Sequence, residues 1–175
     1  MATPERNVVT GKILIAYTTR MGSTAEIAQA IARDLAAAGK STEVAELAAV
    51  STLAGFGAVV IGTPVYLAKV EKDVASFVAR HREALLRVPV AAFAVGIAPV
   101  DPRVGSVEDI LGKLRAALDP VRPVAVAMFA GRLELSRMSF LQRTLTGAMK
   151  VLTGDFRDWD AIGRWARELP EVLQA

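Results

Sequence analysis

The sequence predicts an α/β fold in which helices cover both faces of a parallel β-sheet. Short apolar runs alternate with amphipathic helical patterns along the chain, which is the rhythm of such sheets. Of the residues, 53% are hydrophobic and 22% are charged, which is enough to bury a core. The length of 175 residues suits one domain. We therefore expect a single three-layer sandwich over residues 1–175, with right-handed crossovers between its strands.

Five segments are predicted as strands because they are short and rich in apolar residues, as strands buried on both faces usually are. They are 12–17, 41–47, 58–61, 90–95 and 123–130. The second shows the weakest pattern. Each strand is followed by a helix or a loop, so the carboxyl ends of the strands are expected at one edge of the sheet.

Four further segments place apolar residues at helical spacing. They are 23–38, 70–86, 107–118 and 161–169. Gly39 is positioned to end the first helix, and Asp158 to cap the last. His81 is expected on the exposed side of the second helix.

Composition excludes several kinds of chemistry. The chain has no cysteine and one histidine, so we expect no disulfide, no thiol nucleophile, no Ser-His-Asp triad and no metal site. The net charge is only +3, the basic residues are scattered, and aromatic residues make up 6%. These features argue against a nucleic-acid partner. The polar start of the chain predicts no secretory signal, so we expect a cytoplasmic protein.

The turn after the first strand predicts an anion-binding site. It combines hydroxyl groups, a glycine and the start of a helix, whose free N–H groups and dipole favour a phosphate. Its residues are Thr18, Thr19, Arg20, Met21, Gly22, Ser23 and Thr24. The alternative is that Ser23 or Thr24 only caps the helix, which would account for one hydroxyl.

Residues 131–157 interrupt the alternation, because this stretch is too long for an ordinary connection. From Met138 onward, one side of a helix collects the apolar residues Leu141, Leu145, Ala148, Met149 and Leu152, and Arg143 and Lys150 fall roughly opposite. We therefore predict an inserted amphipathic helix before the last helix. Two alternatives stay open for it: packing against the body, or acting as a substrate cover or a membrane-surface helix.

The spacing Thr19-x-x-Gly22-Ser23-Thr24 directly after a buried strand resembles the FMN phosphate loop of the flavodoxins. That resemblance covers nearly the whole chain and implies strand order 2-1-3-4-5. It also implies that the turns after the third and fourth strands hold the flavin ring, with Tyr66 able to stack on it. Those turns are Gly62, Thr63, Pro64, Val65 and Tyr66, and Gly96, Ile97 and Ala98.

Three further features resemble the quinone-dependent protoporphyrinogen IX dehydrogenases, a flavodoxin-like branch. They are the stretch 128–133 (MFAGRL), Met149-Lys150 and Asp158-Trp159. The resemblance implies an FMN-dependent oxidoreductase of heme biosynthesis. Such an enzyme passes electrons from protoporphyrinogen to a quinone, with peripheral contact at the cytoplasmic membrane face. Flavin chemistry then needs no catalytic side chain, and the substrate carboxylates would meet Arg132, Arg137 and Arg143.

Two other functions remain alternatives. A flavodoxin-like electron carrier or quinone reductase would share the cofactor but lack porphyrin activity. Carrier flavodoxins are typically acidic proteins, so the basic charge of this chain fits the carrier role poorly. A receiver-like signalling domain needs acidic residues after the first and third strands. Thr18 and Gly62 stand there instead, which disfavours it.

Overall fold

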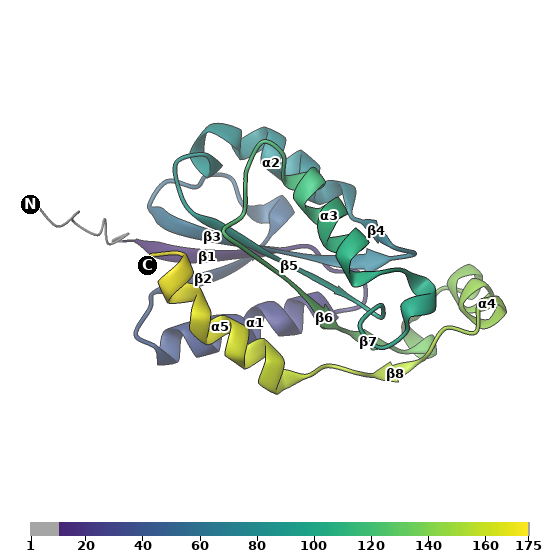
Figure 1. Cartoon of the computed structure of the whole chain (residues 1–175). Helices are drawn as coiled ribbons and strands as arrows, with labels where there is room; N and C mark the ends of the chain where they lie inside the picture. Colours follow the sequence, from purple (N-terminus) through teal and green to yellow (C-terminus); the bar gives the residue numbers. More distant parts are fainter. Residues whose placement is uncertain (1–10, 175) are drawn as a thin grey trace, which may run out of the picture.

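The computed structural model describes residues 11–174 and contains the predicted three-layer sandwich (Figure 1). Five strands form its parallel sheet: β1 (Lys12–Tyr17), β2 (Thr42–Glu46), β3 (Phe56–Tyr66), β5 (Val90–Gly96) and β6 (Ala125–Ala130). Their spatial order is β2-β1-β3-β5-β6, which is the order 2-1-3-4-5 that the flavodoxin resemblance implies. At the centre, Ile15 of β1 lies opposite Val44 of β2 and Val60 of β3.

Two pairs of helices cover the two faces of this sheet. The helices α1 (Ser23–Ala37) and α5 (Trp159–Val172) lie on one face, and α2 (Lys72–Leu85) and α3 (Val107–Leu118) lie on the other (Figure 1). Each face buries its own apolar cluster. The cluster beneath α1 and α5 is centred on the rings of Phe93, Phe129 and Trp165, whose centroids lie 5.6–6.1 Å apart.

The third strand is longer than the sequence predicts. It continues through Gly62 to Tyr66, so this stretch is strand and the expected turn is wrong. Its backbone keeps pairing with β5 as far as Pro64 opposite Val95, and then pairs antiparallel with β4 (Lys69–Val70). The chain reverses only at residues 67–68. The following helix consequently starts at Lys72 and not at residue 70.

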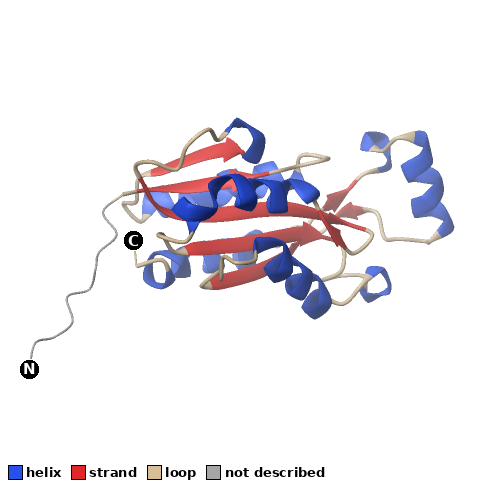
Figure 2. Ribbon diagram, turned by 90° about the horizontal axis from the view of Figure 1, so that it is seen from above, coloured by secondary structure: helices blue, strands red, loops and turns tan. Residues whose placement is uncertain are grey.

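The inserted segment is present, but it is more than one helix. It contains the short antiparallel strands β7 (Arg132–Leu133) and β8 (Gly154–Asp155), which pair with each other. Between them lies α4 (Phe140–Ala148), which is shorter than the predicted helix. In Figure 2, α4 stands beyond the end of the main sheet, apart from both helical layers.

Three single turns of 3-10 helix connect the main elements. They span Leu47–Ala49, Pro102–Val104 and Leu135–Arg137. The last of them leads from β7 into α4.

Of two predictions made for single helix residues, the structure confirms the cap at Asp158 and contradicts the exposure of His81. The carboxylate of Asp158 accepts a hydrogen bond from the N–H of Ala161 at 2.9 Å, so the predicted cap of α5 is confirmed. His81 is buried, which contradicts the expected exposure. Its ring packs against Phe77 with centroids 4.7 Å apart, and its Nε2 lies 3.2 Å from the carbonyl oxygen of Val50. The loop before β3 therefore covers a side of α2 that the helical pattern alone would leave in solvent.

Candidate functional site at the carboxyl edge of the sheet

Three segments that the sequence singles out separately line one open cleft of about 440 Å³. The first segment follows β1, the second is the end of β3, and the third follows β5. The start of the inserted segment, which follows β6, also lines the cleft. The cleft residues are Thr19, Arg20, Met21, Ser23, Thr24, Pro64, Val65, Tyr66, Val95, Gly96, Ile97, Gly131, Arg132 and Leu133. Parallel strands bring their carboxyl ends to one edge, which is why these segments meet there.

The first wall of the cleft is the turn between β1 and α1. Gly22 is the residue before the first turn of α1 and has φ +92°, a conformation that favours glycine. Its N–H donates to the hydroxyl oxygen of Thr19 at 3.0 Å, which leaves the hydroxyl proton of Thr19 free to point elsewhere. Among residues 11–174 no side chain caps α1, whose cap residue is Gly22, so the alternative of simple capping by Ser23 or Thr24 is wrong.

Two residues of this turn are bound to the start of α2. The hydroxyl of Thr18 donates to Asp73 at 3.1 Å, and the guanidinium of Arg20 forms an ion pair with Glu71 at 2.5 Å. Arg20 also lies 5.8 Å from the centre of the Tyr66 ring. Arg20 therefore connects the first and second walls of the cleft. Its predicted contact with a phosphate stays a prediction.

The inserted segment contacts the same turn through hydrogen bonds. The hydroxyl of Ser23 accepts from the backbone N–H of Arg132 at 3.1 Å and lies 3.3 Å from the Arg132 carbonyl oxygen. The guanidinium of Arg137 donates to the carbonyl oxygen of Met21 at 3.0 Å. A Cβ added at Gly22 would lie 3.3 Å from that guanidinium, so glycine permits the close approach.

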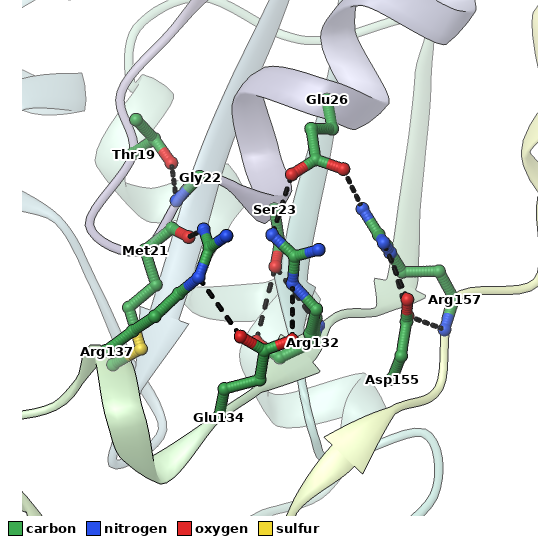
Figure 3. Close-up of polar contacts among 10 residues, drawn as sticks. All are labelled: Thr19, Met21, Gly22, Ser23, Glu26, Arg132, Glu134, Arg137, Asp155 and Arg157. Atoms are coloured by element: carbon green, nitrogen blue, oxygen red, sulfur yellow. Dashed lines mark hydrogen bonds and ion pairs between the residues drawn. The ribbon is translucent and has the colours of Figure 1, made fainter.

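Behind this contact lies a cluster of arginines and carboxylates (Figure 3). Glu26, in the first turn of α1, pairs with Arg132 at 2.8 Å and also with Arg157. Arg157 is nearly buried and pairs with Asp155 at 2.6 Å. Glu134 lies 3.1 Å from Arg137 and 3.4 Å from the Nε of Arg132. The Arg132 contact is an ion pair only, since among the described residues that Nε makes no hydrogen bond.

The cluster lowers the pKa of its carboxyl groups. Hydrogen bonds from Arg157 hold the pKa of Asp155 at about 2, against an ordinary value of 3.8. The pKa of Glu26 is lowered too, first by its hydrogen bond from Arg157 and then by the nearby charges of Arg157 and Arg132. The hydrogen bonds to Asp155 and Glu26 in turn raise the pKa of Arg157. These groups therefore stay charged at neutral pH and hold β7 and β8 against α1.

The three arginines predicted to meet a substrate lie in different surroundings. Arg132 is mostly buried in the ion pairs just described. Arg137 lies over the turn between β1 and α1. Arg143 is exposed on α4, and its Nε donates to the carbonyl oxygen of Met138 at 3.1 Å. Arg132 and Arg137 thus both contact Glu134, whereas Arg143 lies apart on α4, and the contact of each with a substrate carboxylate stays a prediction.

A second, apolar pocket of about 510 Å³ adjoins the cleft. Its walls come from the end of β3, the loop after β5, β6 and α4. The lining residues are Val65, Tyr66, Leu67, Ala68, Ile97, Ala98, Val104, Ile110, Met128, Leu133, Leu145, Thr146, Met149 and Val151. Sequence reasoning included Val65, Tyr66, Ile97 and Ala98 but missed the others. Leu145 and Met149 were assigned only to the apolar side of the inserted helix, and that side in fact covers this pocket.

Residues 11–174 contain neither a cluster of metal-binding side chains nor a helix that could span a membrane. Within that range no three acidic or histidine side chains gather where a metal ion could bind. Nor does any of its helices have the length and apolar character needed to cross a bilayer.

The comparison with known proteins places the chain in a family. A model of the flavodoxin domain matches residues 14–160, so the chain belongs to the flavodoxin-domain family. No curated protein matches the sequence significantly.

Three solved structures of similar fold are flavodoxins. A flavodoxin from the domain Archaea is 16% identical with TM-score 0.56, and the match covers 94% of this chain and 99% of that one. A short-chain flavodoxin associated with a bacterial microcompartment has TM-score 0.61 at 10% identity, covering 94% and 99%. Oxidised flavodoxin 2 from Bacillus cereus has TM-score 0.55 at 15% identity, covering 92% and 99%. At these identities the likeness establishes the fold.

Flavodoxin-domain proteins bind FMN, and the residues present here fit that cofactor. The start of α1 offers free N–H groups and a positive dipole end to a phosphate. Gly22 leaves the space that a Cβ would fill, and Arg137 adds a positive charge next to it. The adjoining pocket offers apolar walls to a flat conjugated ring.

Proposed function

We propose that this chain binds FMN in the cleft and acts as an FMN-dependent redox protein. One observation carries the proposal: the segments after β1, at the end of β3 and after β5 line a single cleft at the edge of the sheet where such folds bind ligands. Parallel topology brings the segments together, and their chemistry supports the cofactor: hydroxyl groups and a helix start lie at one end of the cleft, and an apolar pocket adjoins the other.

Different residues of the chain would bind the two parts of the cofactor, the phosphate at one end of the cleft and the ring at the other. The phosphate would lie at Thr19, Gly22, Ser23 and Thr24, with the helix dipole of α1 behind it. The ring would lie between the end of β3 and the loop after β5, where Tyr66 and Ile97 line both the cleft and the apolar pocket. FMN supplies the electron-accepting chemistry when bound, and the protein binds it, orients it and excludes water.

A finer proposal concerns the substrate. The resemblance to protoporphyrinogen IX dehydrogenases and the apolar pocket beside the cleft both support oxidation of a porphyrinogen, with a quinone reduced to the quinol. The similarity to flavodoxins supports the second candidate equally. That candidate is an electron carrier or quinone reductase without porphyrin activity.

The cofactor is tested first. Freshly purified protein should be yellow, or should become so with FMN, and mass spectrometry of the released chromophore should identify FMN. A colourless protein that does not bind added FMN would refute the redox proposal as a whole.

The substrate is tested second, with the FMN-loaded protein. We expect sustained oxidation of protoporphyrinogen when a quinone is present to take up the electrons from the reduced flavin. If the bound FMN is reduced by another donor but protoporphyrinogen is not turned over, the carrier or quinone reductase is the correct alternative.

A further inference from the structure

The stretch 135–152, called here the α4 segment, exposes an unusual number of large apolar side chains. Six of the twelve exposed large hydrophobic residues in the described chain belong to it. They are Leu135, Phe140, Leu141, Leu145, Met149 and Leu152. Phe140 is 87% exposed and Leu141 77%, the highest values among these twelve. The apolar side of α4 is therefore only partly used in covering the apolar pocket.

The positive charge of the chain is concentrated in the same region. The chain has 21 basic and 18 acidic residues. The inserted segment, 131–157, holds five of the basic and two of the acidic residues, so the remainder has sixteen of each and no net charge. Within 135–152 there are three basic residues and no acidic one. The net charge of +3 thus belongs entirely to the inserted segment.

The basic residues of the α4 segment point in two directions. Arg137 turns toward the body, where it contacts Met21 and Glu134. Arg143 and Lys150 are exposed and lie on the segment that carries the apolar side chains. The outer part of the segment is therefore apolar with a cationic rim.

We propose that the α4 segment docks on an anionic lipid surface. Phe140 and Leu141 would enter the region between head groups and acyl chains, while Arg143 and Lys150 would lie against anionic head groups. Ser139 and Gln142 form a capping box that keeps the two apolar residues in an ordered first turn. In Figures 1 and 2 α4 lies at the outer end of the molecule, so the body does not obstruct a flat surface there.

A bilayer fits this surface better than a protein partner does. A stable protein interface needs roughly 800 Å² from each side, and the nine residues of α4 offer a small, protruding area. A second copy of the chain carries the same cationic residues, Arg143 and Lys150, on this patch, so its patch does not supply the opposite charge. A lipid surface accepts protruding apolar groups and also supplies the opposite charge. The proposal does not depend on the cofactor.

The test is sedimentation of the full chain with lipid vesicles. We expect binding to phosphatidylcholine vesicles containing a quarter phosphatidylserine, weaker binding in high salt, and much weaker binding to pure phosphatidylcholine. Replacing Arg143 and Lys150 by Gln should lower binding to the anionic vesicles roughly 25-fold, since each cation contributes about fivefold. Replacing Phe140 and Leu141 by Ser should lower it by about tenfold or more.

A matched control is Leu86→Ser, because Leu86 is 55% exposed but follows the far helix α2. It should bind vesicles like the unchanged chain, and circular dichroism should show that every variant is folded. The proposal is wrong if the unchanged chain ignores anionic vesicles, or if the Phe140 and Leu141 variant binds them equally well. It is also wrong if the chain dimerises in solution and that variant is monomeric, because the patch is then a self-association surface.

Discussion

At the scale of single residues, Gly62 shows how the core constrains the edge of the site. An added Cβ at Gly62 would lie 2.3 Å from the ring of Phe93, which is fully buried and in contact with Phe129 and Trp165. The ring cannot move aside without disturbing its aromatic neighbours. We therefore predict that Gly62→Ala lowers the free energy of unfolding by about 2–3 kcal/mol, the upper part of the range for overpacked cores.

The same substitution at Gly112 is the control for that prediction. Gly112 lies in α3 and has no neighbouring atom within 4 Å of its added Cβ. Gly112→Ala should raise the unfolding free energy by up to about 1 kcal/mol, because alanine favours helix. Urea unfolding of both variants measures the difference. Equal stability for the two would show that the contact with Phe93 does not limit position 62.

Arg137 gives a second prediction at this scale, and it rests on the proposed FMN site. If its guanidinium lies beside the phosphate, Arg137→Gln should weaken FMN binding by roughly five- to tenfold, as expected for a half-exposed charged hydrogen bond. Riboflavin has no phosphate, so its affinity should stay the same. Arg137→Lys keeps the charge and should recover part of the loss. Equal weakening of both ligands would mean that Arg137 acts on the fold and not on the phosphate.

At the scale of elements, a buried carboxylate helps to hold the end of the α4 segment. Asp101 accepts hydrogen bonds from two guanidinium nitrogens of Arg103, both at 2.7 Å, and from the N–H of Leu152 at 3.4 Å. Arg103 in turn donates to the carbonyl oxygen of Lys150 at 3.1 Å. Asp101→Asn keeps the shape but loses the charge. We expect faster amide hydrogen exchange around 149–153, with the main sheet unaffected.

Asp109→Asn is a suitable control for this variant. It makes the same chemical change at an exposed position on α3 whose carboxylate takes no part in holding the α4 segment. Its exchange near Leu152 should equal that of the unchanged chain. If Asp101→Asn gives no faster exchange there, the hydrogen bonds to Arg103 and Leu152 do not hold the segment in place.

Elements with a strong local signal could be predicted from the sequence, and weakly signalled ones could not. The third helix matches its predicted bounds, because Ser106 caps it and its apolar residues keep helical spacing to Leu118. The extension of β3 was missed because Gly62 and Pro64 read locally as a turn, whereas pairing with β5 continues through them. Strands β7 and β8 have two residues each, too few for any periodicity.

At the scale of the whole molecule, the place of the candidate site was predictable while its inner contacts were not. The convergence of three segments follows from parallel topology, which the alternation of strands and helices already indicates. The ion pairs of Glu26 join residues far apart in the chain, since its partner Arg157 is 131 positions away. No local pattern marks such a pair. The inward direction of Arg137 depends likewise on how the inserted segment folds back over α1.

The distribution of these ion pairs predicts how the molecule responds to acid. Asp155 and Asp101 each have a pKa of about 2, against an ordinary value of 3.8, because of hydrogen bonds from Arg157 and Arg103. A lowered pKa means that these groups stabilise the folded state above about pH 4. That stabilisation is lost as the pH falls toward 2. Both contacts lie where the inserted segment is attached, since Asp155 belongs to β8 and Asp101 accepts a hydrogen bond from Leu152.

We therefore expect acid to release the inserted segment before it unfolds the sheet. Between about pH 4 and pH 2, hydrogen-exchange protection should fall around residues 150–157 while the amides of β3 and β5 stay protected. Far-ultraviolet circular dichroism should change little over the same range. The variant Asp155→Asn has lost the titrating group, so its protection near β8 should already be low at neutral pH and should depend less on pH. Loss of protection in the sheet and the segment at one common pH would show that the two unfold as a single unit, and that these pairs do not control the attachment of the segment separately.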